Sequence, residues 1–212
     1  MDNKIILIDG QQQRTLEDLS ELPKGLQLII TGTDNTIIID EECNFSKTRI
    51  QLNTNHSKIV IGKKVKMGNL IIGLGPGDNE ILEIGDSTTF FGGHIYLRDN
   101  THVIIGKNCL FSVGLCIRST DAHTIFDYTN KHVLNKGAEV LKIGNHCWFG
   151  EDVMVLKNGS VSSDSVVGTR SLITKPFSES HIVIAGFPAK VIRKNIDWSR
   201  LTIPDYEKRL HK

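Results

Sequence analysis

Bulky apolar residues recur at every sixth position along one long stretch of the chain. Six successive members of this series are apolar: Ile143, Phe149, Val155, Val161, Val167 and Ile173. Four positions after each of the first five stands a small or slim residue: Cys147, Val153, Gly159, Ser165 and Ser171. A period of six fits neither an α-helix, which has about 3.6 residues per turn, nor a simple alternating strand. It predicts short strands separated by corners.

Three such strands close one triangular turn, so the pattern predicts an all-β solenoid. Bulky aliphatic residues then fill the inside of the prism, and slim residues occupy the bends. Shorter pieces of the same register start at residues 39, 61, 84 and 105, with spacings of 22, 23 and 21 residues. Successive turns are expected to stack as parallel strands about 4.8 Å apart. An ordinary sandwich of short strands is the alternative fold.

The places where the pattern stops predict how the chain is organised. Residues 1–30 precede the regular hexads and are expected to cap the base of the solenoid, which occupies 31–175. Within it, the repeat pauses over about 118–142, and long excursions from a regular scaffold often carry function. Residues 176–212 form a C-terminal segment and a tail.

Smaller elements are expected outside the regular turns. Residues 5–8 are typical of a strand, and residues 15–22 of a short helix that ends before Pro23. The Gly-Pro-Gly cluster within 73–80 predicts a loop between turns. Beyond residue 195 the chain is polar and charged, and a short terminal helix is expected.

Composition and charge narrow the function. Lys and Arg together number 25 and Asp and Glu 24, so the net charge of +1 argues against a dedicated nucleic-acid binder. No apolar run reaches the length of about 18 residues that a membrane span needs, and the N-terminus lacks the pattern of a signal peptide. A cytoplasmic protein is therefore expected. The scattered cysteines, Cys43, Cys109, Cys116 and Cys147, predict small packed residues rather than disulfides or metal ligands.

Three blocks of sequence resemble the hexapeptide-repeat acyltransferases, in particular the galactoside, maltose and xenobiotic acetyltransferase group. They are Ile143–Gly150, Val166–Lys175 and Ala185–Arg193. A closer resemblance, to capsular polysaccharide and polysialic acid O-acetyltransferases, rests on Ser119–His123 and Lys194–Trp198. The resemblance implies a left-handed parallel β-helix, a homotrimer and acetyl-CoA as co-substrate. One departure is Thr124, where many relatives have proline after the histidine.

The resemblance also implies a catalytic pair. Acetyl transfer to a sugar hydroxyl needs a base, because the hydroxyl is too weakly acidic to attack a thioester unaided, and an imidazole can take that proton. His123 matches the catalytic histidine of the family, and Asp121 is a candidate to orient its ring. Trp148 precedes an inward position, so its side chain should point outward, where the matching residue of relatives lies near the thioester.

Contacts with CoA follow from the same resemblance. Thr169 matches a position that contacts the pantetheine arm, and Glu151 matches another cofactor-contact position. Lys190 and Arg193 match residues that meet the nucleotide phosphates, which favour cationic partners. The remaining candidates, on the same face, are Thr174 and Lys175. No metal is expected, because the chain lacks the His-x4-His pair of zinc enzymes with this fold.

The resemblance implies an acetyl-CoA-dependent O-acetyltransferase acting on a cell-surface or capsular glycan, such as one containing sialic acid. Active sites would lie between subunits of a trimer, with direct transfer assisted by His123. An acetyltransferase for a small sugar, nucleotide sugar or antibiotic is the alternative enzyme. A non-catalytic β-solenoid scaffold is the remote alternative, and it would need neither the insert nor the Ala-Gly-x-Pro-Ala-Lys sequence.

Overall fold

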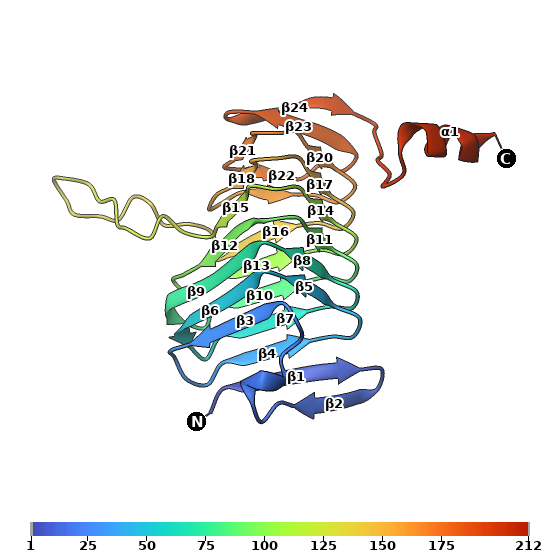
Figure 1. Ribbon diagram of the computed structural model, residues 1–212. Coiled ribbons are helices and arrows are strands. Elements are labelled where there is room, and N and C mark those ends of the chain that lie inside the picture. Colours follow the sequence, from blue (N-terminus) through green and yellow to red (C-terminus); the bar gives the residue numbers. More distant parts are fainter. Residues whose placement is uncertain (1, 212) are drawn as a thin grey trace.

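Three sheets, one on each side of a triangular prism, make up most of the computed structural model, which describes residues 2–211 (Figure 1). All but the terminal strand pairs run parallel. The first face has nine strands, in the order β2 (Gln12–Thr15), β1 (Lys4–Asp9), β4 (Thr36–Ile39), β7 (Lys58–Ile61), β10 (Ile81–Ile84), β13 (His102–Ile105), β16 (Val140–Ile143), β19 (Ser160–Val161) and β22 (Pro176–Phe177).

The other two faces complete each turn. The second face has eight strands, in the order β24 (Ala189–Lys194), β23 (Ile182–Gly186), β20 (Val166–Val167), β17 (Trp148–Phe149), β14 (Leu110–Phe111), β11 (Thr89–Phe90), β8 (Lys66–Gly68) and β5 (Asn44–Ser46). The third face has seven strands, in the order β21 (Leu172–Ile173), β18 (Met154–Val155), β15 (Leu115–Arg118), β12 (Gly93–Leu97), β9 (Leu70–Asp78), β6 (Thr48–Asn55) and β3 (Leu26–Ile30). The predicted parallel β-solenoid is confirmed.

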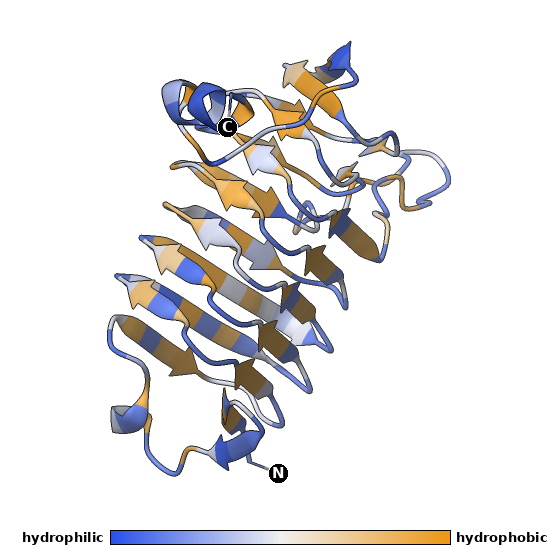
Figure 2. Cartoon of the chain, turned by 90° about the vertical axis from the view of Figure 1, so that its right-hand side faces the viewer, coloured by the Kyte–Doolittle hydropathy of each residue, from blue (hydrophilic) through white to orange (hydrophobic). Residues whose placement is uncertain are grey.

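The interior of the prism is the hydrophobic core, and it consists of the six-residue series. All six members of the series from 143 to 173 are at most 2% exposed. Behind the second face, the rings of Phe90 and Phe111 stack with centroids 4.6 Å apart, and Phe111 and Phe149 follow at 4.7 Å. Figure 2 shows the same division along the chain, with hydrophobic strand segments joined by largely hydrophilic turns.

The base of the solenoid differs from the sequence prediction. A helix over 15–22 was expected, and this is wrong: Thr15 ends β2, and only one 3₁₀ turn, η1 (Leu19–Glu21), follows. Leu16 N–H still donates to the Ile5 carbonyl at 2.8 Å, so strand pairing continues past Thr15. The Asp18 carboxylate then accepts from Ser20 N–H at 2.7 Å, a local turn that competes with a longer helix.

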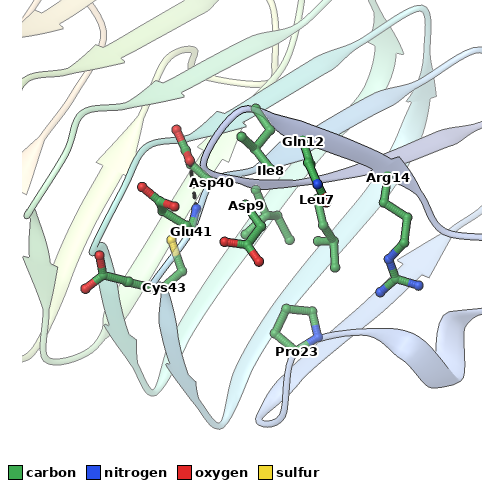
Figure 3. A pocket seen from close by; sticks show the side chains of 11 residues that line it. Leu7, Ile8, Asp9, Gln12, Arg14, Pro23, Asp40, Glu41 and Cys43 are labelled. Carbon is green, nitrogen blue, oxygen red and sulfur yellow. Dashed lines mark hydrogen bonds between the residues drawn. The ribbon is translucent and has the colours of Figure 1, made fainter.

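A pocket of about 620 Å³ opens between this basal hairpin and the first turn. Figure 3 shows Asp9, Asp40 and Glu41 on one side of it, with Arg14 on the other. The Glu41 carboxylate pairs with Lys63 at 2.8 Å and accepts from Gly10 N–H, and these bonds lower its pKa. None of the site residues predicted from the sequence lies in this pocket.

The Gly-Pro-Gly segment is also different from the prediction of a loop over 73–80. The strand β9 continues to Asp78, with a cis peptide bond between Gly75 and Pro76. Pairing with β12 stops at Leu74, so the missing N–H of Pro76 leaves no ladder bond unmade on that side. A strand that loses one neighbour therefore tolerates glycine and proline.

Two segments leave the prism. Residues 119–139, between β15 and β16, form the insert expected over about 118–142 and extend from one side (Figure 1). The tail ends in α1 (Ile203–Leu210), which confirms the expected terminal helix. Among residues 2–211 no helix has the length and apolar character to cross a bilayer. The four cysteines are unbonded thiols, as the sequence predicts, and burial raises the pKa of Cys43 to about 11.

The phenylalanine stack tests the interior directly. Phe111→Ala removes the central ring, and we expect the free energy of unfolding in urea to fall by about 3–5 kcal/mol. Phe91→Ala makes the same chemical change at a position that is 54% exposed, and its cost should be about 0.5 kcal/mol. Equal losses in the two variants would contradict the placement of Phe111 in the core.

Candidate active site

The insert is a two-stranded antiparallel ribbon that carries His123 near its base. The Asp127 N–H donates to the His132 carbonyl and the Leu134 N–H to the Ile125 carbonyl, both at 2.8 Å. Its tip turns on the Asp127 carboxylate, which accepts from the N–H groups of Thr129 and Asn130 at 2.8 and 2.9 Å. Large apolar side chains are exposed along the ribbon: Ile125, Phe126, Tyr128, Val133 and Leu134.

A polar network fixes the base of the insert to the neighbouring turn. Lys157 forms an ion pair with Asp121 and donates to the Asn135 carbonyl at 2.7 Å. Asn135 Nδ2 in turn donates to Asp121 Oδ2 at 2.9 Å and to the His123 carbonyl at 2.8 Å. The bond from Lys157, followed by that from Asn135, lowers the pKa of Asp121. This carboxylate therefore anchors the loop, and its bonds go to Lys157 and Asn135 rather than to the His123 ring.

His123 lines a pocket of about 360 Å³ between the insert and the corner of the prism. Thr120 and Ala122 form one wall, and Asn135 and Lys157 another. The His123 side chain is exposed, and within residues 2–211 no hydrogen bond holds its ring nitrogens. An exposed imidazole over a pocket is available to a substrate hydroxyl.

Trp148 lies on the second face, in β17, and is 40% exposed while the next residue, Phe149, is buried. This confirms the predicted outward direction. Trp198 of the C-terminal tail lies beside it, with ring centroids 6.0 Å apart, and stacks on His146 at 4.6 Å. Trp198 Nε1 also donates to the His146 carbonyl at 2.8 Å.

The tail is held further down the prism by Arg200. Its guanidinium donates to the carbonyl of Cys109 at 2.8 Å and to that of Ser87 at 3.3 Å. The tail therefore runs along one corner of the solenoid and places Trp198 beside Trp148. Trp198 belongs to the Lys194–Trp198 resemblance, but no local signal in the sequence shows where a tail returns to the fold.

His123 and Trp148 lie on different sides of one chain. The insert leaves the corner between the third and first faces, whereas β17 belongs to the second face, and Figure 1 shows the insert and β17 on opposite sides. The two predicted catalytic residues are therefore not brought together within a single subunit.

Two of the predicted CoA contacts lie together on neighbouring turns. Thr169 stands above Gly150, since a Cβ at Gly150 would come within 2.8 Å of the Thr169 Oγ1 atom. The Glu151 carbonyl accepts from Arg170 N–H at 2.7 Å in the same corner. Glu151 and Thr169 are both exposed there, at one edge of the third face.

The other four candidates lie near the top of the solenoid. Thr174 and Lys175 follow β21 at the opposite edge of the third face, and Lys175 lines a pocket of about 300 Å³ together with Lys190 of β24. Arg193 lies outside that pocket. The pairing of β23 with β24 is irregular between Val183 and Ile184, and such a bulge places Lys190 and Arg193 on the same side of the ribbon despite their spacing of three.

One group of possible metal ligands surrounds His146. Its Nδ1 lies 3.2 Å from Asp164 Oδ1 and 3.5 Å from Asp197 Oδ1, and the three ligand atoms are within 4.8 Å of one another. The contact with Asp164 is a histidine–carboxylate hydrogen bond, and Trp198 stacks on the ring. His146 is thus held by a local hydrogen bond and by ring stacking.

A parallel β-solenoid with a six-residue period, whose insert presents a histidine over a pocket, defines the class of hexapeptide-repeat acetyltransferases. No family model matches the chain. It is 34% identical over 181 residues, 85% of this chain and 83% of the relative, to a polysialic acid O-acetyltransferase of Neisseria meningitidis. The chain belongs to the polysialic acid O-acetyltransferase family and is an acetyltransferase.

Solved structures agree. The polysialic acid O-acetyltransferase OatWY superposes with a TM-score of 0.79 at 27% identity, covering 99% of this chain and 98% of that one. The polySia-specific acetyltransferase NeuO superposes with a TM-score of 0.69 at 26% identity, covering 89% of this chain and all of that one. The resemblance predicted from the sequence is confirmed.

The anchoring of the insert gives a pH-dependent prediction. Because folding lowers the pKa of Asp121, its stabilising contribution is complete above the ordinary aspartate value of about 3.9 and is lost as pH falls through the lowered value. Asp121→Asn should therefore speed amide exchange over residues 121–135 several-fold at neutral pH, whereas the unmodified chain should keep its protection down to about pH 5.

Mass spectrometry of deuterium uptake measures the exchange rate in Asp121→Asn and the protection of the unmodified chain as the pH falls. Glu139→Gln is the matched control, because it removes one exposed carboxylate from the same pocket without an ion pair in the described chain. Protection unchanged in Asp121→Asn would show that the Lys157 pair does not hold the insert.

Proposed function

We propose that the protein transfers acetyl from acetyl-CoA to a hydroxyl of a capsular or cell-surface glycan that contains sialic acid. The observation that carries the proposal is the exposed imidazole of His123 over an open pocket, in a chain whose relatives are named for polysialic acid. The pocket lies beside a protruding ribbon, and most of its lining residues are exposed. Such an open site suits a polymer that passes through, and it favours this acceptor over a small sugar or antibiotic.

His123 acts as the general base. A ring nitrogen takes the proton of the acceptor hydroxyl as its oxygen attacks the acetyl carbonyl, and the proton then passes to the departing sulfur. The Asn135 bond to the His123 carbonyl and the Asp121–Lys157 pair fix the backbone that presents the ring. Acetyl-CoA supplies the activated acyl group and a thiolate leaving group.

The upper turns fit such a donor. Lys175 and Lys190 line one pocket, and their charges suit the phosphates of a nucleotide. Glu151 and Thr169, across the third face, offer polar contacts for the thinner pantetheine arm. As a user of acetyl-CoA, the enzyme would work in the cytoplasm.

A homotrimer completes the site. The apolar side chains along the insert need a partner surface, and a threefold ring brings the insert of one subunit to the second face of the next. His123 of one subunit then meets Trp148 and Trp198 of its neighbour.

His123→Ala tests the base. Thiol release from acetyl-CoA with a sialic acid oligomer as acceptor should fall by about 10²–10⁴-fold. His132→Ala is the matched control, since this histidine is exposed on the same insert and lies outside the pocket. Full activity in His123→Ala would exclude it as the base. No transfer to any glycan by the unmodified chain would exclude the acceptor class.

Mixed oligomers test the shared site. His123→Ala and Trp148→Ala subunits should each be poorly active alone. Co-expressed in equal amounts, they should recover about a quarter of normal activity, because that share of interfaces joins an intact histidine to an intact tryptophan. No recovery, with mixed trimers verified by native mass spectrometry, would mean that both residues act within one subunit.

A further inference from the structure

Two arginines on the third face have no anionic partner among residues 2–211. Arg118 ends β15 and Arg98 follows β12 one turn below. In the described chain neither forms an ion pair, although Lys157 at the neighbouring corner is paired with Asp121. In a chain with a net charge of only +1, such a pair is a local excess of positive charge.

Tyr96 holds one of these charges in place. It is paired with Arg118 above it and with Gly73 below. A Cβ at Gly73 would come within 2.7 Å of the tyrosine ring, so glycine lets the ring lie directly against the turn below. The Arg118 guanidinium lies 5.2 Å from the ring centroid, a cation–π distance, and the His94 ring lies nearly parallel to Tyr96 at 5.8 Å.

Arg98 carries an unsatisfied donor. Its backbone is fixed, because the Arg98 N–H donates to Ser119 Oγ at 3.2 Å and its carbonyl accepts from Thr101 Oγ1 at 2.8 Å. Its Nε atom is buried, however, and has no hydrogen-bond partner in the described chain. A guanidinium donor buried without an acceptor is costly, which indicates that a partner comes from outside the chain.

The two guanidinium groups line a pocket of about 160 Å³. Its other walls are Gly75, Tyr96, Thr120 and Ala122. Thr120 and Ala122 also line the pocket of His123, so the two cavities lie on either side of the same short segment. The smaller cavity is too small for a whole sugar but large enough for its carboxylate end.

We infer that Arg98 and Arg118, beside the Tyr96 ring, bind the carboxylate of an acceptor sugar and make the enzyme selective for anionic glycans. The inference rests on the proposed function and adds the residues that select the acceptor. Guanidinium groups match carboxylates with paired, charge-assisted hydrogen bonds, and the tyrosine face suits the C–H surface of a sugar ring. A neutral sugar would leave both cations without a partner, so the same residues disfavour it.

The test compares two acceptors and three variants. The acceptors are a linear sialic acid oligomer and the same oligomer with its carboxylates reduced to alcohols. Arg118→Gln should raise the KM for the anionic oligomer by about 10–100-fold, with little change in the KM for acetyl-CoA or in activity on the reduced oligomer. Arg98→Lys keeps the charge but loses the planar fork, and an intermediate rise is expected.

Arg49→Gln is the matched control. Arg49 lies on the same face, in β6, and its Nε donates to Gln27 at 2.9 Å, away from both pockets. Arg49→Gln removes one positive charge, as Arg118→Gln does, so a general loss of electrostatic attraction for the oligomer would appear in this variant too. Thermal melting of each variant verifies the fold.

Calorimetric binding of the oligomer without acetyl-CoA separates this inference from the proposed function. Normal transfer with unchanged KM and affinity in Arg118→Gln would overturn the inference alone. Binding that depends on Arg118 without any acetyl transfer would support the inference and overturn the proposed chemistry. Failure of the unmodified chain to bind the oligomer would overturn the inference.

Discussion

The hydrogen bonds between successive turns are the constraint on which the rest of the structure depends. A strand in the middle of a face has no partner within its own turn, so its backbone groups are satisfied only by the turns above and below. On the first face the pairing is in register: Ile59 lies between Ile37 and Leu82, and Ile105 between Ile84 and Ile143. These inward side chains therefore have an apolar neighbour above and below, which favours the six-residue period.

That constraint restricts where function can be located. The insert emerges at a corner and returns without disturbing the ladder, because β16 pairs with β13 from His102 and Val140 through to Ile105 and Ile143. The corners and ends of the solenoid can therefore accept inserted residues, whereas an insertion within a face would break the pairing between turns. The insert lies at a corner, and the ribbon formed by β23 and β24 lies at one end of the solenoid. Together with the two edges of the third face, they hold most of the candidate residues.

The sequence was informative wherever a signal repeats. The six-residue period revealed the solenoid, its pause revealed the insert, and the position of Trp148 before an inward residue gave its direction. Predictions that rested on a single local signal were less accurate. The run before Pro23 has helical spacing, but it forms the end of a strand and one 3₁₀ turn. The Asp18 carboxylate accepts a local hydrogen bond from Ser20 N–H, and Leu16 N–H donates to the Ile5 carbonyl of β1.

Side-chain contacts between different turns could not be predicted from the sequence. Arg118 meets Tyr96 across a spacing of 22 residues, and Arg98 shares a pocket with Thr120 and Ala122 at the start of the insert. Nor could any local pattern place Trp198 on His146, 52 residues earlier in the chain. The separation of His123 from Trp148 depends on which face each occupies, and that follows from counting strands around the prism rather than from either residue.

The course of the tail has a consequence for synthesis. A solenoid can add one turn after another as the chain leaves the ribosome, since every turn needs only its predecessor to build on. Arg200, by contrast, bonds to the carbonyls of Ser87 and Cys109, 113 and 91 residues earlier. The earlier turns must therefore be stacked before Arg200 can reach those carbonyls. Trp198 reaches its place beside Trp148 in the same step, so this pair of tryptophans forms only after the turns that Arg200 binds are in place.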